Sequence, residues 1–192
     1  MKGTLAVAND PAANELLNTD PLALLLGMLL DQQVPMEWAF LAPSKLKDRL
    51  GGSLDANEIV ALGPEKVEAI FRDKPALHRF PGSMGKRAYA VCQHLVEHYG
   101  GKAEALWSDG ADGAELLRRL KEPPGYGDEK SKIFIALLAK RMGVQPAGWE
   151  KAAGPFADPT PRSVADIDSP EAFARVRAWK QAQKKAGKGK QD

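Results

Sequence analysis

The chain has 192 residues, of which 44% are hydrophobic, and its 27 Lys and Arg residues nearly balance its 25 Asp and Glu residues, for a net charge of +2. This length allows one large domain or two small lobes with a buried core. The small net charge excludes strong attraction of nucleic acid by the molecule as a whole, so any such affinity requires a local basic surface.

The sequence predicts helices joined by short loops, with no alternating strand pattern, which indicates an all-α fold. Thr19 or Asp20 is expected to cap a helix that Pro21 opens, since proline is tolerated at the first helical position. The apolar run 22–30 is typical of a central buried helix. Further along the chain, the patterns predict helices over 36–50, 55–62, 64–70 and 86–99, a loop rich in Pro and Gly over 73–85, and a short helical turn over 103–107.

A Gly-x-Gly turn at residues 125–127 lies between two helix-like segments, 114–121 and 128–142. The backbone N–H groups of such a turn, with those at the start of the second helix, form a small concavity that binds an anion. A DNA phosphate fits this concavity without any base being read. Gly127 or Asp128 is expected to cap the second helix. Taken alone, the turn is also typical of an ordinary connection between packed helices.

The C-terminal part of the chain has a different character. Residues 143–168 contain Gly and Pro at intervals that break any long helix. Ser169 and Pro170 are expected to start a last helix. Beyond it, the Lys-rich segment 183–192 forms a basic tail that we expect to be disordered, either as a solubilising terminus or as a nonspecific tether for phosphate.

Two motifs together resemble a known family. With its flanks, the segment Pro-Gly-Tyr-Gly at 124–127 resembles the hairpin of the helix-hairpin-helix DNA glycosylases, the HhH-GPD superfamily. Residues 25–34 are similar to the family's early buried helix, which ends in a Ser-x-Gln or Ser-Gln-Gln segment, with Asp31 here in place of the usual Ser. In the family, this Gln emerges at the DNA and helps to fill the gap left by an extruded base. The order and separation of the motifs match the family, and the resemblance covers residues 20–145.

The resemblance implies a two-lobed, HhH-GPD DNA glycosylase-like domain over 1–182, with the helix-hairpin-helix at 114–142. It implies a monomer that binds duplex DNA and removes a modified base by hydrolysing its N-glycosidic bond, as in base-excision repair. The hairpin looks like that of the monofunctional N-glycosylases, because its lysines do not align with the nucleophile of bifunctional relatives. No metal or other cofactor is expected, and the single Cys92 excludes a four-cysteine iron–sulfur cluster.

The single cysteine also favours a reducing cytoplasm and excludes a disulfide framework within the chain. No apolar run approaches the ~20 residues that span a bilayer. The run 22–30 is too short, and Asp20 and Asp31 bracket it. We therefore expect a cytoplasmic protein without a membrane partner.

The DNA-contacting residues that the resemblance implies come from three segments. Gln33 is expected to enter the duplex as a wedge and to offset part of the cost of unstacking a base. His78 and Arg79, at the tip of the loop 74–82, are expected to contact phosphate or the orphaned base, with Phe80 stacking; alternatively, a buried Phe80 pins the loop. The hairpin and the helix after it contribute the remaining candidates, which are Gly125, Tyr126, Gly127, Lys130 and Lys132.

The catalytic carboxylate is the open question. In the family, an Asp roughly twenty to twenty-five residues after the hairpin stabilises the positive charge that grows on the sugar as the base leaves. The corresponding window, 147–151, contains no Asp, and Glu150 is its only carboxylate. Glu150 replaces the Asp, or a longer loop returns Asp158 or Asp166 to the site, or the chain is a non-catalytic module that recognises damaged DNA. Trp149 either lines the base pocket by stacking or plugs the core.

Overall fold

A computed structural model describes residues 2–191, and every regular element in this range is a helix, which confirms the predicted all-α class. The first half of the chain contains α1 (Pro11–Thr19), α2 (Pro21–Leu30), α3 (Met36–Arg49), α4 (Ala56–Leu62), α5 (Pro64–Arg72) and α6 (Pro81–Tyr99). The second half contains η1 (Ala103–Leu106), α7 (Gly113–Leu120), α8 (Asp128–Arg141), α9 (Trp149–Ala153), η2 (Gly154–Ala157), η3 (Val164–Asp166) and α10 (Pro170–Lys185), where η denotes a 3₁₀ helix.

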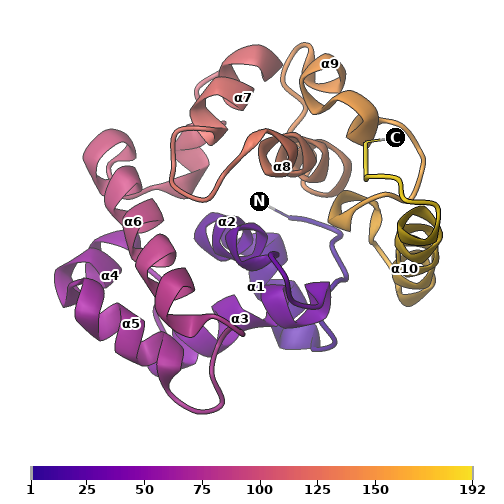
Figure 1. The fold of residues 1–192 in the computed structure, drawn as a ribbon. Helices are drawn as coiled ribbons and strands as arrows, with labels where there is room; N and C mark the ends of the chain where they lie inside the picture. Colours follow the sequence, from indigo (N-terminus) through magenta and orange to yellow (C-terminus); the bar gives the residue numbers. More distant parts are fainter. Residues whose placement is uncertain (1, 192) are drawn as a thin grey trace.

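Helix α2 lies at the centre of the molecule, as predicted. Every residue from Leu22 to Leu30 is buried. Asp20 caps the helix, because its carboxylate accepts hydrogen bonds from the N–H groups of Leu22 and Ala23. Helices α3 to α6 lie on one side of α2, and α7, α8 and α9 lie on the other (Figure 1). An all-apolar helix in this position is stable because both groups cover it.

The predicted loop over 73–85 is wrong in its last part, since α6 begins at Pro81 rather than at Lys86. Gly82 and Gly85 suggested a loop, but in the structure they allow α6 to pack closely against α5. A Cβ at Gly85 would lie 3.0 Å from the Cα of Glu68 and 3.2 Å from the Cβ of Phe71, both in α5. Helix α1 was not predicted at all, although Asp10 caps it through the N–H of Ala13.

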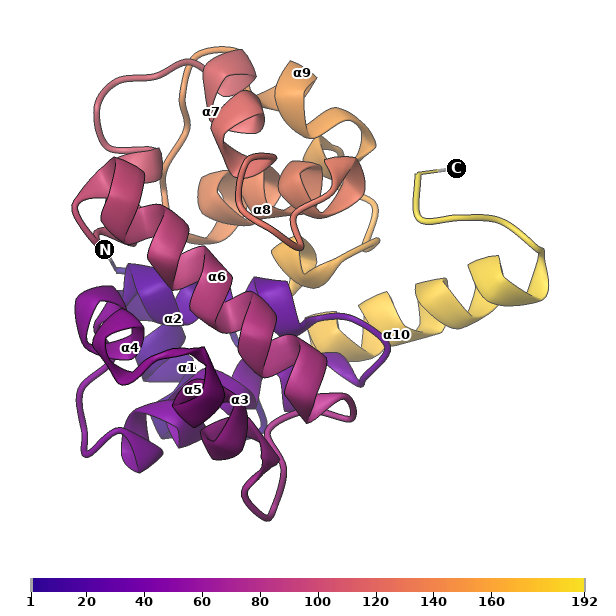
Figure 2. The ribbon, with the colours of Figure 1, turned by 60° about the vertical axis from the view of Figure 1, so that its left-hand side comes forward.

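The C-terminal segment is helical and then returns to the body of the protein. Ser169 caps α10 through the N–H of Ala172, as predicted. After α10 the chain turns back (Figure 2), and the Lys190 ammonium lies 3.2 Å from the Glu129 carboxylate, while the expected disorder of the tail stays a prediction. This ion pair joins the tail to α8. Met1 and Asp192, the outermost residues of the predicted domain and tail, lie outside the described residues.

Candidate functional site

The hairpin between α7 and α8 is fastened to α2 by Tyr126. The tyrosine is buried, its ring lies edge-on to Phe134 at 6.0 Å, and its hydroxyl donates a 2.6 Å hydrogen bond to the carbonyl of Leu25. Burial raises the pKa of Tyr126 well above its ordinary value. The side chain therefore points into the core, which corrects the predicted DNA contact of Tyr126: it positions the hairpin and is not exposed to a ligand.

In the first turn of α8, Lys130 makes a second link to α2. Its ammonium donates a 2.7 Å hydrogen bond to the carbonyl of Leu29. Burial lowers the pKa of Lys130 to about 8, and the nearby Asp31 opposes this effect only in part. Lys132 behaves differently, because it forms an ion pair at 2.7 Å with Asp128 on the same helix. Of the two predicted lysines, only Lys130 faces α2.

The two hairpin glycines leave backbone exposed to solvent for different reasons. Gly125 has a φ of +93°, which favours glycine, and a Cβ there would lie only 2.6 Å from Cδ1 of Leu29. Gly127 caps α8 with a φ of −85°, and a Cβ there would have no neighbour within 4 Å. Gly125 is therefore required by the fold, whereas Gly127 leaves open the surface at the start of α8.

The segment after α2 holds Gln33 in an uncommon conformation. Gln33 is exposed and has a φ of +57°, and it is the one residue other than glycine with a positive φ in the range 2–191. Its neighbour Gln32 accepts a 2.9 Å hydrogen bond from Arg87 of α6. A non-glycine residue held in this region carries strain that the surrounding contacts must support, a situation common at functional sites.

His78 binds the backbone of this segment from the buried side. Its Nε2 lies 3.1 Å from the carbonyl oxygen of Leu30 and 3.1 Å from that of Gln32. The imidazole is buried, and burial lowers the pKa of His78. The predicted contact between His78 and DNA is therefore corrected, because its side chain binds the backbone beneath Gln33 and does not reach the surface.

The tip of the same loop remains available. Phe80 is 42% exposed, so the alternative in which a buried Phe80 pins the loop is wrong. The guanidinium of Arg79 lies over the Phe80 ring, 5.3 Å from its centroid. Leu77 and His78 are the buried residues that hold the loop in place. The DNA contact of Arg79 stays a prediction that is compatible with its exposure.

A pocket of about 790 Å³ lies where the hairpin, the end of α2 and helix α10 meet. Its lining includes four of the predicted DNA-contacting residues, together with two residues that the sequence did not single out for the site: Gln33, Gly125, Gly127, Lys130, Asp31 and Lys180. The two sequence motifs thus converge on one cavity, although they are far apart in the chain. A signal for Lys180 existed, since it lies four residues after the buried Val176 on α10.

The three carboxylates predicted from spacing do not line this pocket. Glu150 is exposed on α9. Asp158 forms an ion pair at 2.8 Å with Arg162, which lowers the pKa of Asp158. Asp166 forms a capping box with Ser163 and pairs at 2.7 Å with Lys140, so it stabilises the η3 turn. Asp158 and Asp166 thus have structural partners, and Glu150 remains a candidate on spacing alone.

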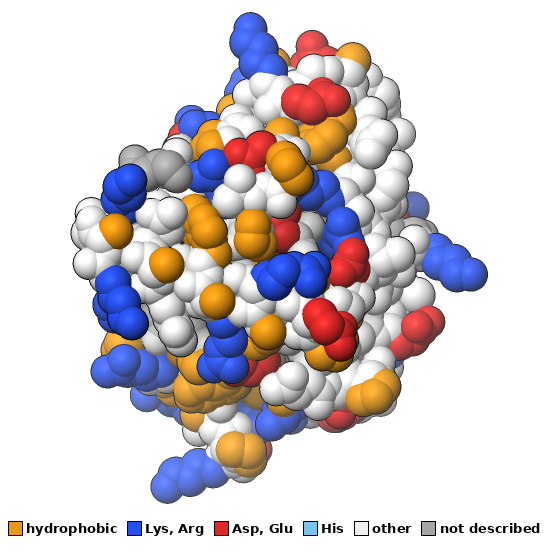
Figure 3. Space-filling model, turned by 90° about the vertical axis from the view of Figure 1, so that its right-hand side faces the viewer, with side chains coloured by type: hydrophobic (Ala, Val, Ile, Leu, Met, Phe, Trp, Pro, Cys, Tyr) orange, Lys and Arg blue, Asp and Glu red, His pale blue; other side chains and the backbone are white. Residues whose placement is uncertain are grey.

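Trp149 also lies away from the pocket. It is half-buried against the hydrophobic core at the start of α9 and is not part of the pocket lining. This favours the alternative in which Trp149 plugs the core. On the face of the molecule that carries α9 and α10, basic, acidic and hydrophobic side chains are interspersed (Figure 3), so this face has no uniformly basic surface.

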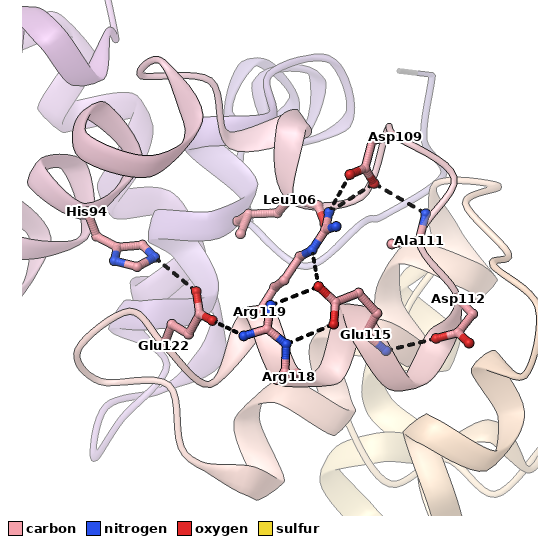
Figure 4. Close-up of polar contacts among 9 residues, drawn as sticks. All are labelled: His94, Leu106, Asp109, Ala111, Asp112, Glu115, Arg118, Arg119 and Glu122. Atoms are coloured by element: carbon pink, nitrogen blue, oxygen red, sulfur yellow. Dashed lines mark hydrogen bonds and ion pairs between the residues drawn. The ribbon is translucent and has the colours of Figure 1, made fainter.

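A cluster of charged side chains joins α7 to the segment after η1 (Figure 4). Arg119 pairs at 2.8 Å with both Glu115 and Asp109, and Arg118 pairs with Glu115 and Glu122. These charges satisfy one another. Within residues 2–191, no group of three or more His, Cys, Asp or Glu side chains is arranged to hold a metal ion. We therefore assign this cluster a structural role.

A comparison of the chain with protein-family models, with curated proteins and with solved structures gave no match. None of the helices in residues 2–191 combines the length and the apolar character that crossing a bilayer requires. Function is therefore inferred from the pocket and from the two motifs that border it.

Proposed function

We propose that the protein binds duplex DNA at the hairpin, receives an extruded nucleotide in the pocket and releases a modified base by hydrolysing its N-glycosidic bond. The convergence of Gln33, Gly125 and Gly127 on one cavity carries this proposal. At about 790 Å³, the cavity falls in the range of about 300–1,000 Å³ that is typical of small-molecule sites. The protein would then be a monomeric, cytoplasmic base-excision repair enzyme with a two-lobed HhH-GPD fold.

The proposed roles follow from exposure and backbone geometry. The exposed backbone at Gly125 and Gly127 is suited to a phosphate, because it presents N–H groups without side chains in the way. Gln33 projects from a strained turn that His78 supports, so it is suited to enter the duplex as a wedge. Arg79 and Phe80 would contact the neighbouring strand from the adjacent loop.

Asp31 is the carboxylate that we assign to the chemistry. The other acidic residues that line the pocket have basic partners: Glu37 pairs with Arg177, Asp128 with Lys132, and Glu129 with Lys190. The Asp31 carboxylate forms no ion pair among the described residues, and it lines the pocket beside Lys130. An ionised carboxylate at this position would stabilise the positive charge on the sugar while water attacks. This assignment replaces Glu150, Asp158 and Asp166.

A second function is favoured by the finding that Glu150, Asp158 and Asp166 do not line the pocket. If Asp31 does not support base release, the protein is a non-catalytic module that recognises damaged or bent duplex through its hairpin and its wedge. This alternative retains every DNA contact proposed above and removes only the hydrolysis.

Base release from duplexes that each carry one lesion separates the two functions. The lesions are uracil, hypoxanthine, an alkylated purine, an oxidised guanine and an oxidised pyrimidine, and abasic sites are detected by alkaline cleavage. We expect release from one class of lesion by the wild type and by Glu150→Gln and Asp166→Asn, and loss of release in Asp31→Asn. Tight binding without release by any variant would identify the non-catalytic module, and unaltered release by Asp31→Asn would contradict the assignment of Asp31.

A further inference from the structure

Two ammonium groups from different helices line the pocket. Lys130 comes from α8 and Lys180 from α10, and both side chains are partly buried. The Lys130 ammonium binds the carbonyl of Leu29, and the Lys180 ammonium lies 2.9 Å from the sulfur of Met36, which is a weak acceptor. Among the described residues, neither lysine forms an ion pair. Two ammonium groups, which water hydrates strongly, are therefore partly removed from water, and the acceptors that they find in the protein replace only part of that hydration.

The carboxylates around the pocket do not fully neutralise the positive charges of Lys130 and Lys180. The carboxylates of Glu37, Asp128 and Glu129 are paired with other basic residues, as described above. Asp31 remains, and it is the strongest favourable electrostatic neighbour of both lysines. Glu129 and Asp166 attract Lys180 more weakly and are themselves paired with Lys190 and Lys140, so neither Lys130 nor Lys180 has a carboxylate as an ion-pair partner among the described residues.

We propose that Lys130 and Lys180 form a binding site for an oxyanion, a phosphate or carboxylate group, inside the pocket. The free protein keeps two partly buried cations with too few acceptors, which a bound oxyanion would supply. Each ammonium carries three N–H donors, and Lys130 uses one of them on Leu29. A charged acceptor in this position would form charge-assisted hydrogen bonds, which are about twice as strong as neutral ones.

The natural source of the oxyanion rests on the proposed function. It is either the backbone phosphate beside an extruded nucleotide or a carboxylate carried by an oxidised base. In both cases the pocket would reject a base with a positive charge, such as an N-alkylated purine, because the uncompensated ammonium would repel it. The site therefore defines a substrate class as well as an anchor.

The first experiment tests the oxyanion site without DNA. Thermal unfolding is measured in inorganic phosphate and in chloride of the same ionic strength, for the wild type, Lys130→Met, Lys180→Met and the double variant. The exposed pair Lys184→Met and Lys185→Met is the matched control. We expect phosphate to raise the Tm of the wild type and the control, and the increment to fall in each single variant and to vanish in the double variant. An equal increment in the wild type and the double variant would overturn the proposal.

The second experiment identifies the source. Affinity is measured for duplexes that contain an abasic-site analogue, a 5-carboxylated cytosine or an N7-methylated guanine. Loss of about tenfold in affinity for the abasic duplex in Lys130→Met and Lys180→Met supports the phosphate, and the same loss confined to the carboxylated base supports the carboxylate. Preference for the N7-methylated guanine that is equal in the wild type and the double variant would overturn the proposal.

The outcomes keep the oxyanion site and the proposed function apart. A phosphate-dependent Tm increment that needs both lysines, with no duplex binding, supports the oxyanion site and contradicts the proposed function. Duplex binding that is equal in the wild type and the double variant, with no phosphate increment, supports the proposed function and contradicts the oxyanion site.

Discussion

The Tyr126 hydroxyl and the Leu25 carbonyl, separated by 101 positions in the chain, are joined by a buried 2.6 Å hydrogen bond. Four residues further along both segments, Lys130 in α8 binds the carbonyl of Leu29 in α2. These two contacts hold the hairpin against α2, and they bring the exposed glycines beside Gln33. The pocket exists because the two motifs are fastened together in this register.

Removing the tyrosine hydroxyl measures the strength of this link. We expect Tyr126→Phe to lower the free energy of unfolding by about 1 kcal/mol, because a typical buried hydrogen bond contributes about 0.5–1.5 kcal/mol and the aromatic packing on Phe134 is kept. Urea denaturation of both proteins checks this value. An unchanged midpoint would show that the hydroxyl does not anchor the hairpin.

The two hairpin glycines provide a matched pair of variants. We expect Gly127→Ala to fold with a loss of about 0.5–1 kcal/mol, because a Cβ there meets nothing within 4 Å but alanine is a poor N-cap for α8, and to bind duplexes of any sequence more weakly, because the methyl group blocks the approach of a phosphate. Gly125→Ala should instead unfold more easily, by about 1–3 kcal/mol, since it clashes with Leu29 at a positive φ. Unchanged duplex affinity of Gly127→Ala would remove the hairpin from the proposed interface.

The native Gln33 is expected to lower the stability of the fold through its backbone strain and to raise the affinity for duplex DNA as a wedge. We expect Gln33→Gly to raise the free energy of unfolding by about 1 kcal/mol, because glycine adopts a φ of +57° without strain. Affinity for a duplex with an abasic-site analogue should fall, because the wedge is lost. Gln33→Ala is the control, since it removes the wedge but keeps the strain. Equal stability of both variants would show that the backbone conformation at this position is not strained.

Lys130 is likewise expected to lower the stability of the fold while it serves the pocket, and this cost in the free energy of unfolding should depend on pH with a sign that its pKa fixes. Its pKa is about 8 in the folded protein and 10.5 in the unfolded chain, so the unfolded chain binds more protons between these values. The buried charge therefore lowers stability below pH 8, and its cost fades as the pH rises toward 10.5. Each pKa unit corresponds to about 1.4 kcal/mol, so removing the ammonium in Lys130→Met should raise the free energy of unfolding at pH 7 by up to roughly 3 kcal/mol. Loss of the hydrogen bond to Leu29 should lower it by about 1 kcal/mol.

The difference in unfolding free energy between the wild type and Lys130→Met, measured from pH 7 to pH 10.5, isolates this effect from the neighbouring charges, which both proteins share. Those neighbours are Asp31, His78, Arg87 and Lys190. A difference that does not shrink with rising pH would contradict the assignment of a buried ammonium to Lys130.

Local rules in the sequence were sufficient for much of the fold. The caps at Asp20 and Ser169 follow from side-chain chemistry that acts over three residues, and the apolar run 22–30 predicted the central helix. The start of α6 was missed because Gly82 and Gly85 have the same appearance in a loop and in a close helix contact. Only the position of α5 beside them distinguishes the two cases.

The candidate site was predicted in outline, but several side chains were placed wrongly. A Gly-x-Gly pattern does not reveal where the middle residue points, so the inward Tyr126 could not be inferred. His78 was assigned to the surface because the carbonyl groups that it binds belong to a distant turn. Lys180 reaches the pocket from a helix that lies outside both motifs. The spacing argument led to Glu150, whereas the carboxylate beside the lysines is Asp31.

Both anchors of the hairpin combine a donor from a specific side chain with an acceptor from the main chain. The hydroxyl of Tyr126 and the ammonium of Lys130 are chemically irreplaceable in these contacts, whereas any residue at positions 25 and 29 supplies the same carbonyl. Mutational tolerance should therefore be unequal on the two sides of the interface: apolar exchanges of similar volume in α2 keep both hydrogen bonds, whereas a change at Tyr126 or Lys130 removes one of them.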